Sequence, residues 1–274
     1  MHNTLSSLEK NIVIPSRGKH LDLNTDFGQS RDRAFFESTD FALLKWVSTV
    51  NMPCCVHDGD PAETLKLVEK AKQFHCEVGA HIGYPDPASH GYGEYTGTQE
   101  ELYAWIVLQL GALQALMQAS GLDVVHVRPH GALYLAFLSQ PETARTVAEA
   151  MYKLNPWLIL LGPAGPVLSD VAKKVGLRVM PELVLGKVYN RDGALAADRL
   201  NDSLAPQAVV EQARMMIDDK QVMTTDGRKV AVQFSSLHLS PRQPEVLSIA
   251  EKVSQQMGQP TAISLLTAGE SGWL

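Results

Sequence analysis

The sequence predicts one α/β domain built as a seven-stranded (β/α) barrel of the TIM type, related to the glycoside hydrolase and deacetylase barrels. Short apolar runs recur along the 274 residues, and most are followed by a polar loop and then a helical pattern. Many of the loops carry aspartate, glutamate or histidine. The strands of a parallel barrel all end at one rim, so these loops should meet at one mouth.

Strands are predicted where apolar runs are short and bounded by polar residues or glycine. They cover 20–24, 47–52, 78–82, 124–127, 157–161, 177–180 and 230–234, with 262–266 as an eighth strand or a terminal tail. The segment 184–205 has few periodic apolar residues and is long enough for a lid or binding loop.

Helices are predicted between these strands from helical spacing of apolar residues and from capping signals. Asp60 is a good N-cap, Pro61 fits the first helical position and Glu63 would complete a capping box. Thr98 and Glu101 form a second capping box. The predicted helices cover 34–46, 99–116, 141–154, a segment after Gly165, 207–218 and 244–257, with one more that opens at Pro61 and places Leu65, Val68 and Ala71 on one face.

Composition limits the class of protein. A hydrophobic content of 45% suffices for one core over residues 19–274, preceded by a polar arm over 1–18. The net charge of −6 argues against nucleic acid or an anionic membrane surface as a partner. No apolar run reaches the roughly 20 residues that span a bilayer. Three cysteines fit no disulfide framework, so we expect a reduced, cytoplasmic setting.

The first strand carries Asp22, Asn24 and Asp26 at alternate positions, so the three side chains should share one side of the strand. Carboxylates at the mouth could bind a divalent ion or act as a general base. The structural alternative is that Asp26 belongs to a turn with Gly28 and that Asn24 caps loop backbone.

Histidines follow three successive strands. His57 lies among acidic residues that include Asp60, although Asp60 has the competing role of helix cap. His81 ends the third strand, and Asp86 in the turn after it could orient His81 or His57, or could be an ordinary turn residue. Asp26, His57 and His81 are the residues expected to hold a divalent metal, although no short His-x-x-x-His spacing supports one.

The fourth strand ends in a third histidine, His130, with Arg128 and Tyr134 beside it. Arg128 offers a fork of donors to a carboxylate or phosphate, and the Tyr134 hydroxyl can donate a hydrogen bond. Glu182 follows the sixth strand, where burial beside other acids would raise its pKa toward that of a general acid.

No Walker loop occurs, so barrel loops would have to hold any nucleotide. The segment 162–165, Gly-Pro-Ala-Gly before a helix, could cradle phosphate, although such loops more often only turn the chain.

Four motifs resemble those of one family in the same order. Residues 22–28 resemble DLNxDxG, 51–61 resemble NxxCGxHxGDP, 79–86 resemble GAHPGYPD and 128–134 resemble KPHGALY. These motifs are typical of the LamB/YcsF family, and the resemblance covers roughly residues 21 to 260. Arg128 replaces the family's lysine, Cys55 replaces a glycine, and His238-Leu239-Ser240 replaces a late HGD.

The resemblance implies the A subunit of a bacterial 5-oxoprolinase, which opens the lactam 5-oxoproline to glutamate with ATP and Mg²⁺, in company with B and C subunits. The reacting residues would be Asp22, Asp26, His57, His81, His130 and Glu182. The positioning or ligand-binding residues would be Asn24, Asp60, Tyr84, Asp86, Arg128 and Tyr134. Two alternatives stay open: a metal-dependent, ATP-independent deacetylase-like hydrolase, and a non-catalytic ligand-binding paralogue.

Overall fold

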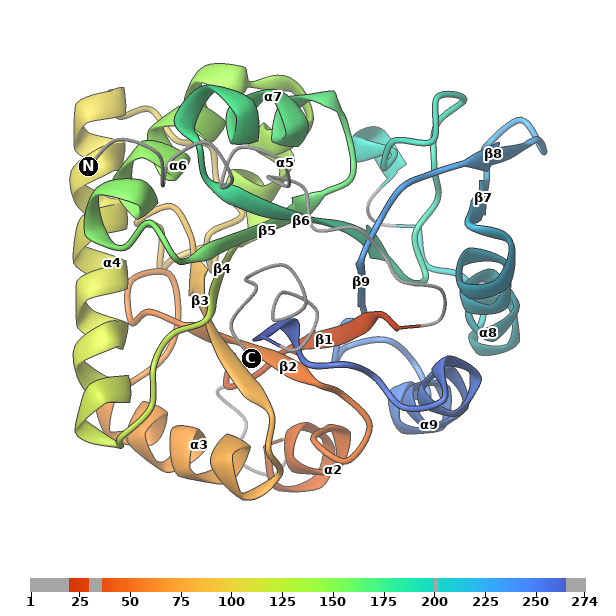
Figure 1. Ribbon diagram of the computed structural model, residues 1–274, viewed down its shortest axis with the longest axis horizontal. Coiled ribbons are helices and arrows are strands. Elements are labelled where there is room, and N and C mark those ends of the chain that lie inside the picture. Colours follow the sequence, from red (N-terminus) through yellow and green to blue (C-terminus); the bar gives the residue numbers. More distant parts are fainter. Residues whose placement is uncertain (1–19, 30–35, 200–201, 265–274) are drawn as a thin grey trace, which may run out of the picture.

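The computed structural model describes residues 20–29, 36–199 and 202–264, and its centre is a closed barrel of seven parallel strands (Figure 1). In barrel order these are β1 (Asp22–Asp26), β2 (Thr49–Pro53), β3 (Glu77–Ile82), β4 (His126–Pro129), β5 (Ile159–Pro163), β6 (Arg178–Val184) and β9 (Ser236–His238). Strand β9 pairs with both β6 and β1, which closes the ring. The predicted TIM-like barrel is confirmed.

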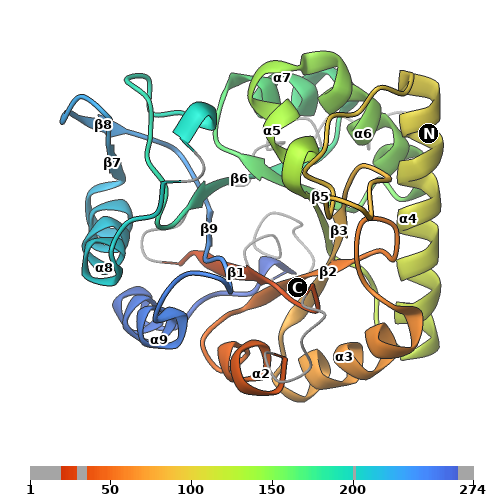
Figure 2. The same ribbon diagram turned by 180° about the vertical axis from the view of Figure 1, so that it is seen from behind.

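Helices surround the barrel on its outside, as both views show (Figures 1 and 2). The longer ones are α3 (Pro61–Gln73), α4 (Gln99–Ala119), α5 (Gly131–Ser139), α6 (Pro141–Leu154), α7 (Pro166–Val175), α8 (Pro206–Arg214) and α9 (Val246–Met257). Short turns occur at η2 (Phe36–Asp40), α2 (Phe41–Leu43), η3 (Ala197–Arg199) and η4 (Met215–Asp219). Of the helix predicted over 34–46, the described residues are α-helical only over 41–43, and 34–35 lie outside the described residues.

The capping signals fix where two helices begin. Asp60 accepts hydrogen bonds from the backbone of Ala62 and Glu63, with Pro61 as the first residue of α3. The Glu63 side chain pairs with Lys66, so the box predicted there is only half formed. Thr98 and its partner three residues later form the full capping box of α4, as predicted.

Alternation along the strands divides the core into an outer shell and a barrel interior. Leu160 and Val179 belong to the large apolar cluster between strands and helices. The residues next to them in sequence, Ile159, Leu161 and Met180, face the barrel interior instead. There they form a separate cluster with Ile263. Much of the remaining interior is polar and buried: Asp22, Asn24, Asn51, His126, Arg128, Glu182 and His238.

The seventh strand was predicted in the wrong place. Residues 229–231 form β8, which pairs antiparallel with β7 (Gln221–Met223) in a two-stranded sheet beside the barrel (Figures 1 and 2). The strand that closes the barrel is the three-residue β9. The eighth strand is also wrong, because Ile263 and Ser264 are helical and 265–266 lie outside the described residues.

The segment 184–205, expected to be a lid or binding loop, packs against the side hairpin as far as it is described. It bridges to the side hairpin through Tyr189, which pairs with Thr224 and is buried. A Cβ at Gly193 would lie 2.9 Å from Val232, so the segment packs against that hairpin. The N-terminal arm predicted over 1–18 lies outside the described residues.

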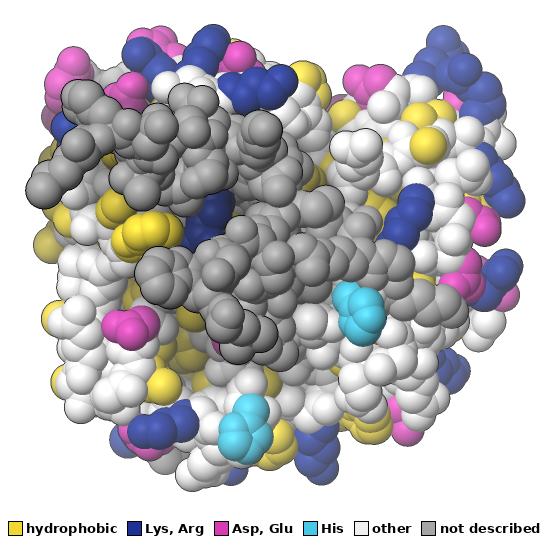
Figure 3. Space-filling view, viewed as in Figure 1, with side chains coloured by type: hydrophobic (Ala, Val, Ile, Leu, Met, Phe, Trp, Pro, Cys, Tyr) yellow, Lys and Arg dark blue, Asp and Glu magenta, His cyan; other side chains and the backbone are white. Residues whose placement is uncertain are grey.

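Helix α4 is long and apolar enough to cross a membrane by length and composition alone, but it packs against α6 and β3 as part of the helical layer. On the face in Figure 3, the coloured basic and acidic side chains are interspersed around the edge. All three cysteines are free, as the odd count predicted.

Candidate active site

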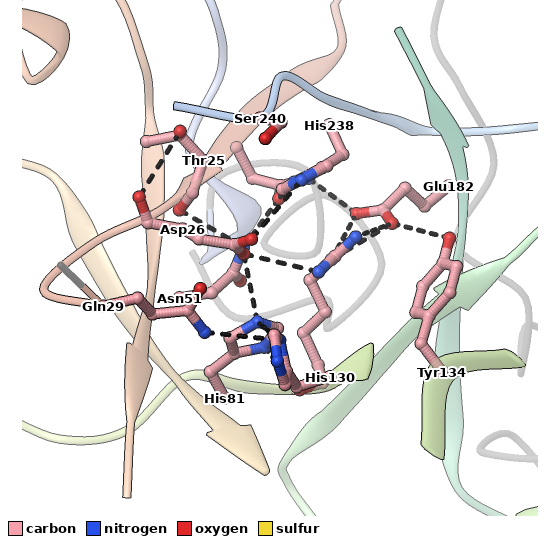
Figure 4. Close-up of polar contacts among 12 residues, drawn as sticks. Thr25, Asp26, Gln29, Asn51, His81, His130, Tyr134, Glu182, His238 and Ser240 are labelled. Atoms are coloured by element: carbon pink, nitrogen blue, oxygen red, sulfur yellow. Dashed lines mark hydrogen bonds and ion pairs between the residues drawn. The ribbon is translucent and has the colours of Figure 1, made fainter. Parts of the chain in front are cut away.

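The carboxyl ends of four barrel strands bring a set of charged and aromatic side chains together (Figure 4). Asp26 ends β1, His81 lies near the end of β3, His130 follows β4 and Glu182 lies on β6. The predicted convergence of distant strand ends therefore occurs for these residues.

The two imidazoles of His81 and His130 meet directly. His81 Nε2 lies 3.0 Å from His130 Nδ1 and 3.2 Å from an Asp26 carboxylate oxygen. The outer nitrogens face backbone carbonyls: His81 Nδ1 is 3.0 Å from the Arg128 oxygen, and His130 Nε2 is 2.8 Å from the His90 oxygen. A carbonyl only accepts, so both outer nitrogens must carry hydrogen.

With this assignment, the neutral rings have a lone pair each on His81 Nε2 and His130 Nδ1, and these two lone pairs face each other. One proton can be bound between the two nitrogens. Burial lowers the pKa of His81 well below its ordinary value, against the opposing charge of Asp26. Burial likewise lowers the pKa of His130. The pair therefore rests neutral at pH 7 and can accept a proton as a general base. We call these two residues the histidine pair.

His57 lies under the same loop as the histidine pair. Its ring stacks on that of His130, with centroids 4.4 Å apart, and a Cβ on Gly83 or Gly91 would press on it. Burial, followed by the charge of His130, lowers the pKa of His57 to about 3. Both of its ring nitrogens are buried and have no hydrogen-bond partner among the described residues. His57 thus packs against His130 and stays neutral.

Arg128 and Glu182 form a buried ion pair. The Arg128 Nη2 and Nε atoms lie 2.9–3.1 Å from the Glu182 oxygens, and Nη1 lies 3.3 Å from Asp26. The Tyr134 hydroxyl donates to Glu182 at 2.8 Å. Burial would raise the pKa of Glu182, but Arg128 lowers it below the ordinary value. The predicted raised pKa is therefore wrong, because Glu182 stays ionised and has no proton to donate as an acid.

Asp26 is ionised for the same kind of reason. Burial opposes its charge, but His81, His238 and Arg128 together lower the pKa of this carboxyl far below its ordinary range. The carboxylate thus sits between the cation of Arg128 and the histidine pair. It will stabilise the pair once the pair is protonated, because His81 Nε2 can then donate to it.

A layer of amides and histidines supports this site from below, and much of it was missed by sequence reasoning. Asn24 donates to Glu182 at 2.8 Å, and its carbonyl oxygen accepts from Asn51 and lies 2.8 Å from His238 Nδ1. His126 Nε2 lies 2.8 Å from the Asn51 oxygen. His238 ends β9, so its place at a strand end was the signal that could have identified it.

Two further residues at the mouth were missed because they lie in loops. The Gln29 amide is 3.3 Å from His130 Nδ1. The Tyr92 ring meets His130 edge-on at 4.9 Å and is 63% exposed. Its loop is held down by the contact of the His90 carbonyl with His130 and by a hydrogen bond between His90 Nδ1 and the Asp58 carboxylate at 3.2 Å. The glycines around Tyr92 were the available signal.

Asp22 does not lie at the mouth. It begins β1, at the opposite end of the strand from Asp26, and accepts hydrogen bonds from Ser48 (2.8 Å) and Ser236. Alternation on a strand fixes the side on which a residue lies, but not its depth in the barrel. Asp22 therefore belongs to the base of the interior, and its predicted reacting role is wrong.

Three of the predicted binding residues have structural roles. Asp60 is exposed and caps α3. Asp86 accepts from the backbone of Ser89 and Gly93, so it shapes its own loop rather than orienting a histidine. Tyr84 is buried and stacks on Tyr95 at 4.6 Å. Polar residues after a strand can serve the turn itself, and that role explains all three.

The residues proposed as metal ligands do not form a metal site. No group of three His, Cys, Asp or Glu side chains in the described part of the chain is arranged to hold an ion. His81 already uses its nitrogens on a carbonyl and on Asp26 and His130, and the Arg128 cation balances Asp26. The donor set therefore does not fit a resident metal.

The segment 162–165, the candidate phosphate-binding loop, has few backbone donors to offer. Gly165 precedes α7, but the first residue of that helix is Pro166, which has no N–H to offer a phosphate. The segment 162–165 therefore offers one donor fewer than an ordinary helix start.

Comparison with known proteins agrees with the fold and the motifs. A Thermus thermophilus protein named as the A subunit of 5-oxoprolinase is 37% identical over 243 residues, which is 87% of this chain and 97% of that protein. The Bacillus cereus protein of the same name is 33% identical over 85% of this chain and 93% of its own length.

The crystal structure of the lactam utilization protein from Thermus thermophilus superposes with a TM-score of 0.81 at 36% identity, covering 89% of this chain and 99% of that one. The sequence model of the LamB/YcsF family matches residues 21–267. The chain belongs to the LamB/YcsF family.

Proposed function

We propose that this chain is the A subunit of an ATP-dependent 5-oxoprolinase, and that it opens 5-oxoproline to L-glutamate at the mouth of its barrel. The observation that carries the proposal is the neutral histidine pair next to the Asp26 carboxylate. Relatives that align over nearly their whole length and are named as 5-oxoprolinase A subunits support it.

The proposed chemistry begins with the lactam, an unreactive amide. Phosphorylation of its oxygen by ATP makes the ring carbon a far easier target for water. As water adds to that carbon, the histidine pair takes its proton, and it returns the proton to the ring nitrogen as the C–N bond breaks. A second water hydrolyses the remaining acyl phosphate to carboxylate and phosphate. General-base catalysis of this kind contributes about 10²- to 10⁴-fold.

The other residues of the site have supporting roles in this proposal. The Arg128 carbonyl holds His81 in the required tautomer, and Asp26 balances the proton that the pair accepts. Arg128 and Glu182 neutralise each other and fix the position of Asp26. ATP with Mg²⁺, and partner B and C subunits, are part of the proposal, since the names of the relatives imply a multi-subunit enzyme. A cytoplasmic location suits such an enzyme.

The two alternatives remain distinct in their requirements. A metal-dependent deacetylase-like hydrolase needs ligands that the described side chains do not supply. A non-catalytic paralogue would need no base, whereas the histidine pair is arranged as one. The 5-oxoprolinase proposal is therefore the one that the geometry favours.

The test is turnover of ATP with a panel of lactams, with and without the candidate B and C subunits. We expect glutamate and phosphate to form together from 5-oxoproline in the full assembly. Phosphate release that no lactam stimulates in either setting would remove the proposal. Amide hydrolysis that needs no ATP and stops with a chelator would instead establish the metal-dependent alternative.

A further inference from the structure

The buried cation of the site is already paired. Three nitrogens of Arg128 contact Glu182 and Asp26, and the side chain is 6% exposed. A substrate carboxylate placed against Arg128 would have to displace one of those carboxylates. A lactam that carries a carboxylate, such as 5-oxoproline, therefore needs a different positive group at the mouth.

Arg242 is an exposed arginine at this end of the barrel. It lies four residues beyond the end of β9, in the segment that leads to α9. Its backbone N–H donates to the Ser240 hydroxyl at 3.3 Å, and Ser240 lies close to His238 at the edge of the site (Figure 4). The turn that carries Arg242 is therefore joined to the strand that carries His238.

The charge of Arg242 acts across the mouth. It favours the charged form of Tyr92, which meets His130 edge-on, and of Asp40, the last residue of η2. Its guanidinium has no hydrogen bond or ion pair with any residue in the described ranges. Arg242 is thus an exposed cation on the turn that follows β9, at the end of the barrel where the histidine pair lies.

We propose that Arg242 binds the carboxylate of the substrate and so makes the site select lactams that carry one. The inference rests on the proposed lactam-opening function. With the carboxylate at Arg242, the lactam ring extends inward toward Tyr92 and the histidine pair. Arginine suits this role, because its planar fork binds a carboxylate through two parallel hydrogen bonds.

A competing role for Arg242 is to balance Asp40. Asp40 is 2% exposed, accepts from the Gly28 backbone, and has one carboxylate oxygen without a partner among the described residues. Burial raises its pKa to about 7, and Arg242 partly offsets this rise. In that role, loss of Arg242 would change stability but not the choice of substrate, which separates the two roles.

The experiment compares Arg242→Gln with the wild type on 5-oxoproline and on 2-pyrrolidinone, the same ring without the carboxylate. The reconstituted assembly gives KM and kcat, and calorimetry gives the affinity of each lactam for the chain. We expect KM for 5-oxoproline to rise about ten- to a hundredfold, the loss of a charge-assisted contact, with kcat nearly unchanged. KM for 2-pyrrolidinone should not move, and Arg242→Lys should retain part of the affinity.

Arg145→Gln is the matched control, an exposed arginine on α6 outside the mouth. The inference fails if Arg242→Gln leaves 5-oxoproline binding within twofold, or weakens both lactams equally. It also fails if the variant raises KM for ATP instead, which would assign Arg242 to a phosphate. If the wild type opens no lactam, the proposed function fails, and calorimetry with 5-oxoproline still decides the role of Arg242.

Discussion

The protonation state of His81 and His130 sets the pH range in which the site can work. Burial lowers the pKa of both rings below the ordinary 6.5, although Asp26 opposes the shift. A lowered pKa keeps the base neutral to a lower pH than free imidazole. We therefore expect kcat/KM for 5-oxoproline to stay on its plateau through pH 6.5 and to fall only at lower pH. An acid limb centred at 6.5 or above would contradict a buried neutral pair.

Asp22, at the opposite end of the barrel from the mouth, should make the stability of the fold depend on pH. Burial raises its pKa to about 7, above the unfolded value of 3.8. In that window the folded chain binds the extra proton, so Asp22 makes stability fall as pH rises, by up to about 1.4 kcal/mol per pH unit. Asp22→Asn should remove this slope and leave activity unchanged.

The measurement for Asp22→Asn is the free energy of unfolding of both proteins at pH 5 and pH 8. The wild type should lose the Asp22 contribution as the pH rises from 5 to 8, and the variant should not. The stability of the variant minus that of the wild type should therefore be larger at pH 8 than at pH 5. Other titrating groups contribute equally to both proteins and cancel in the difference. A large loss of kcat in the variant would instead return Asp22 to the reacting residues.

At the scale of elements, the contact between β3 and β4 depends on a glycine. A Cβ at Gly79 would overlap the His126 ring, and that ring is fixed by its bond to Asn51. Neither side can yield easily in a packed barrel interior. We expect Gly79→Ala to lower the free energy of unfolding by about 1–3 kcal/mol in a denaturant titration.

Gly111 on α4 provides the control for this substitution. An added Cβ there meets nothing within 4 Å, and the position is inside a helix. Gly111→Ala should therefore raise stability by about 0.5–1 kcal/mol. Equal effects of the two substitutions would show that the Gly79 contact is not the cause.

At the scale of the whole molecule, the barrel was predictable because its strands are regular in sequence. The strands β1 to β6 lie within a few residues of the predicted ranges, because a short segment with apolar residues marks each of them. Strand β9 was missed because Ser236–His238 is short and partly polar, whereas 230–234 has the stronger strand composition. Strand β9 closes the barrel by pairing with β1 and β6, and these pairings between distant segments leave no pattern in the local sequence.

The candidate site was predictable in membership but not in its electrostatics. Strand-end position identified Asp26, His81, His130, Arg128 and Glu182. The direction of the Glu182 pKa depended on Arg128, which is far away in sequence and contacts it only in the folded barrel. Positive φ accounts for the glycine that the family motif has at position 55: Cys55 has φ of 58°, a conformation that glycine adopts without strain and cysteine does not.

The most direct test of the account is the kinetics of the histidine pair in the reconstituted assembly. We expect His81→Gln and His130→Gln each to lower kcat for glutamate formation by about 10²- to 10⁴-fold. Because the two rings share one proton, the double variant should be no slower than the slower single variant. His20→Gln, an exposed histidine away from the pair, should keep full activity. Independent, multiplying losses, or a wild-type rate in either single variant, would contradict the account.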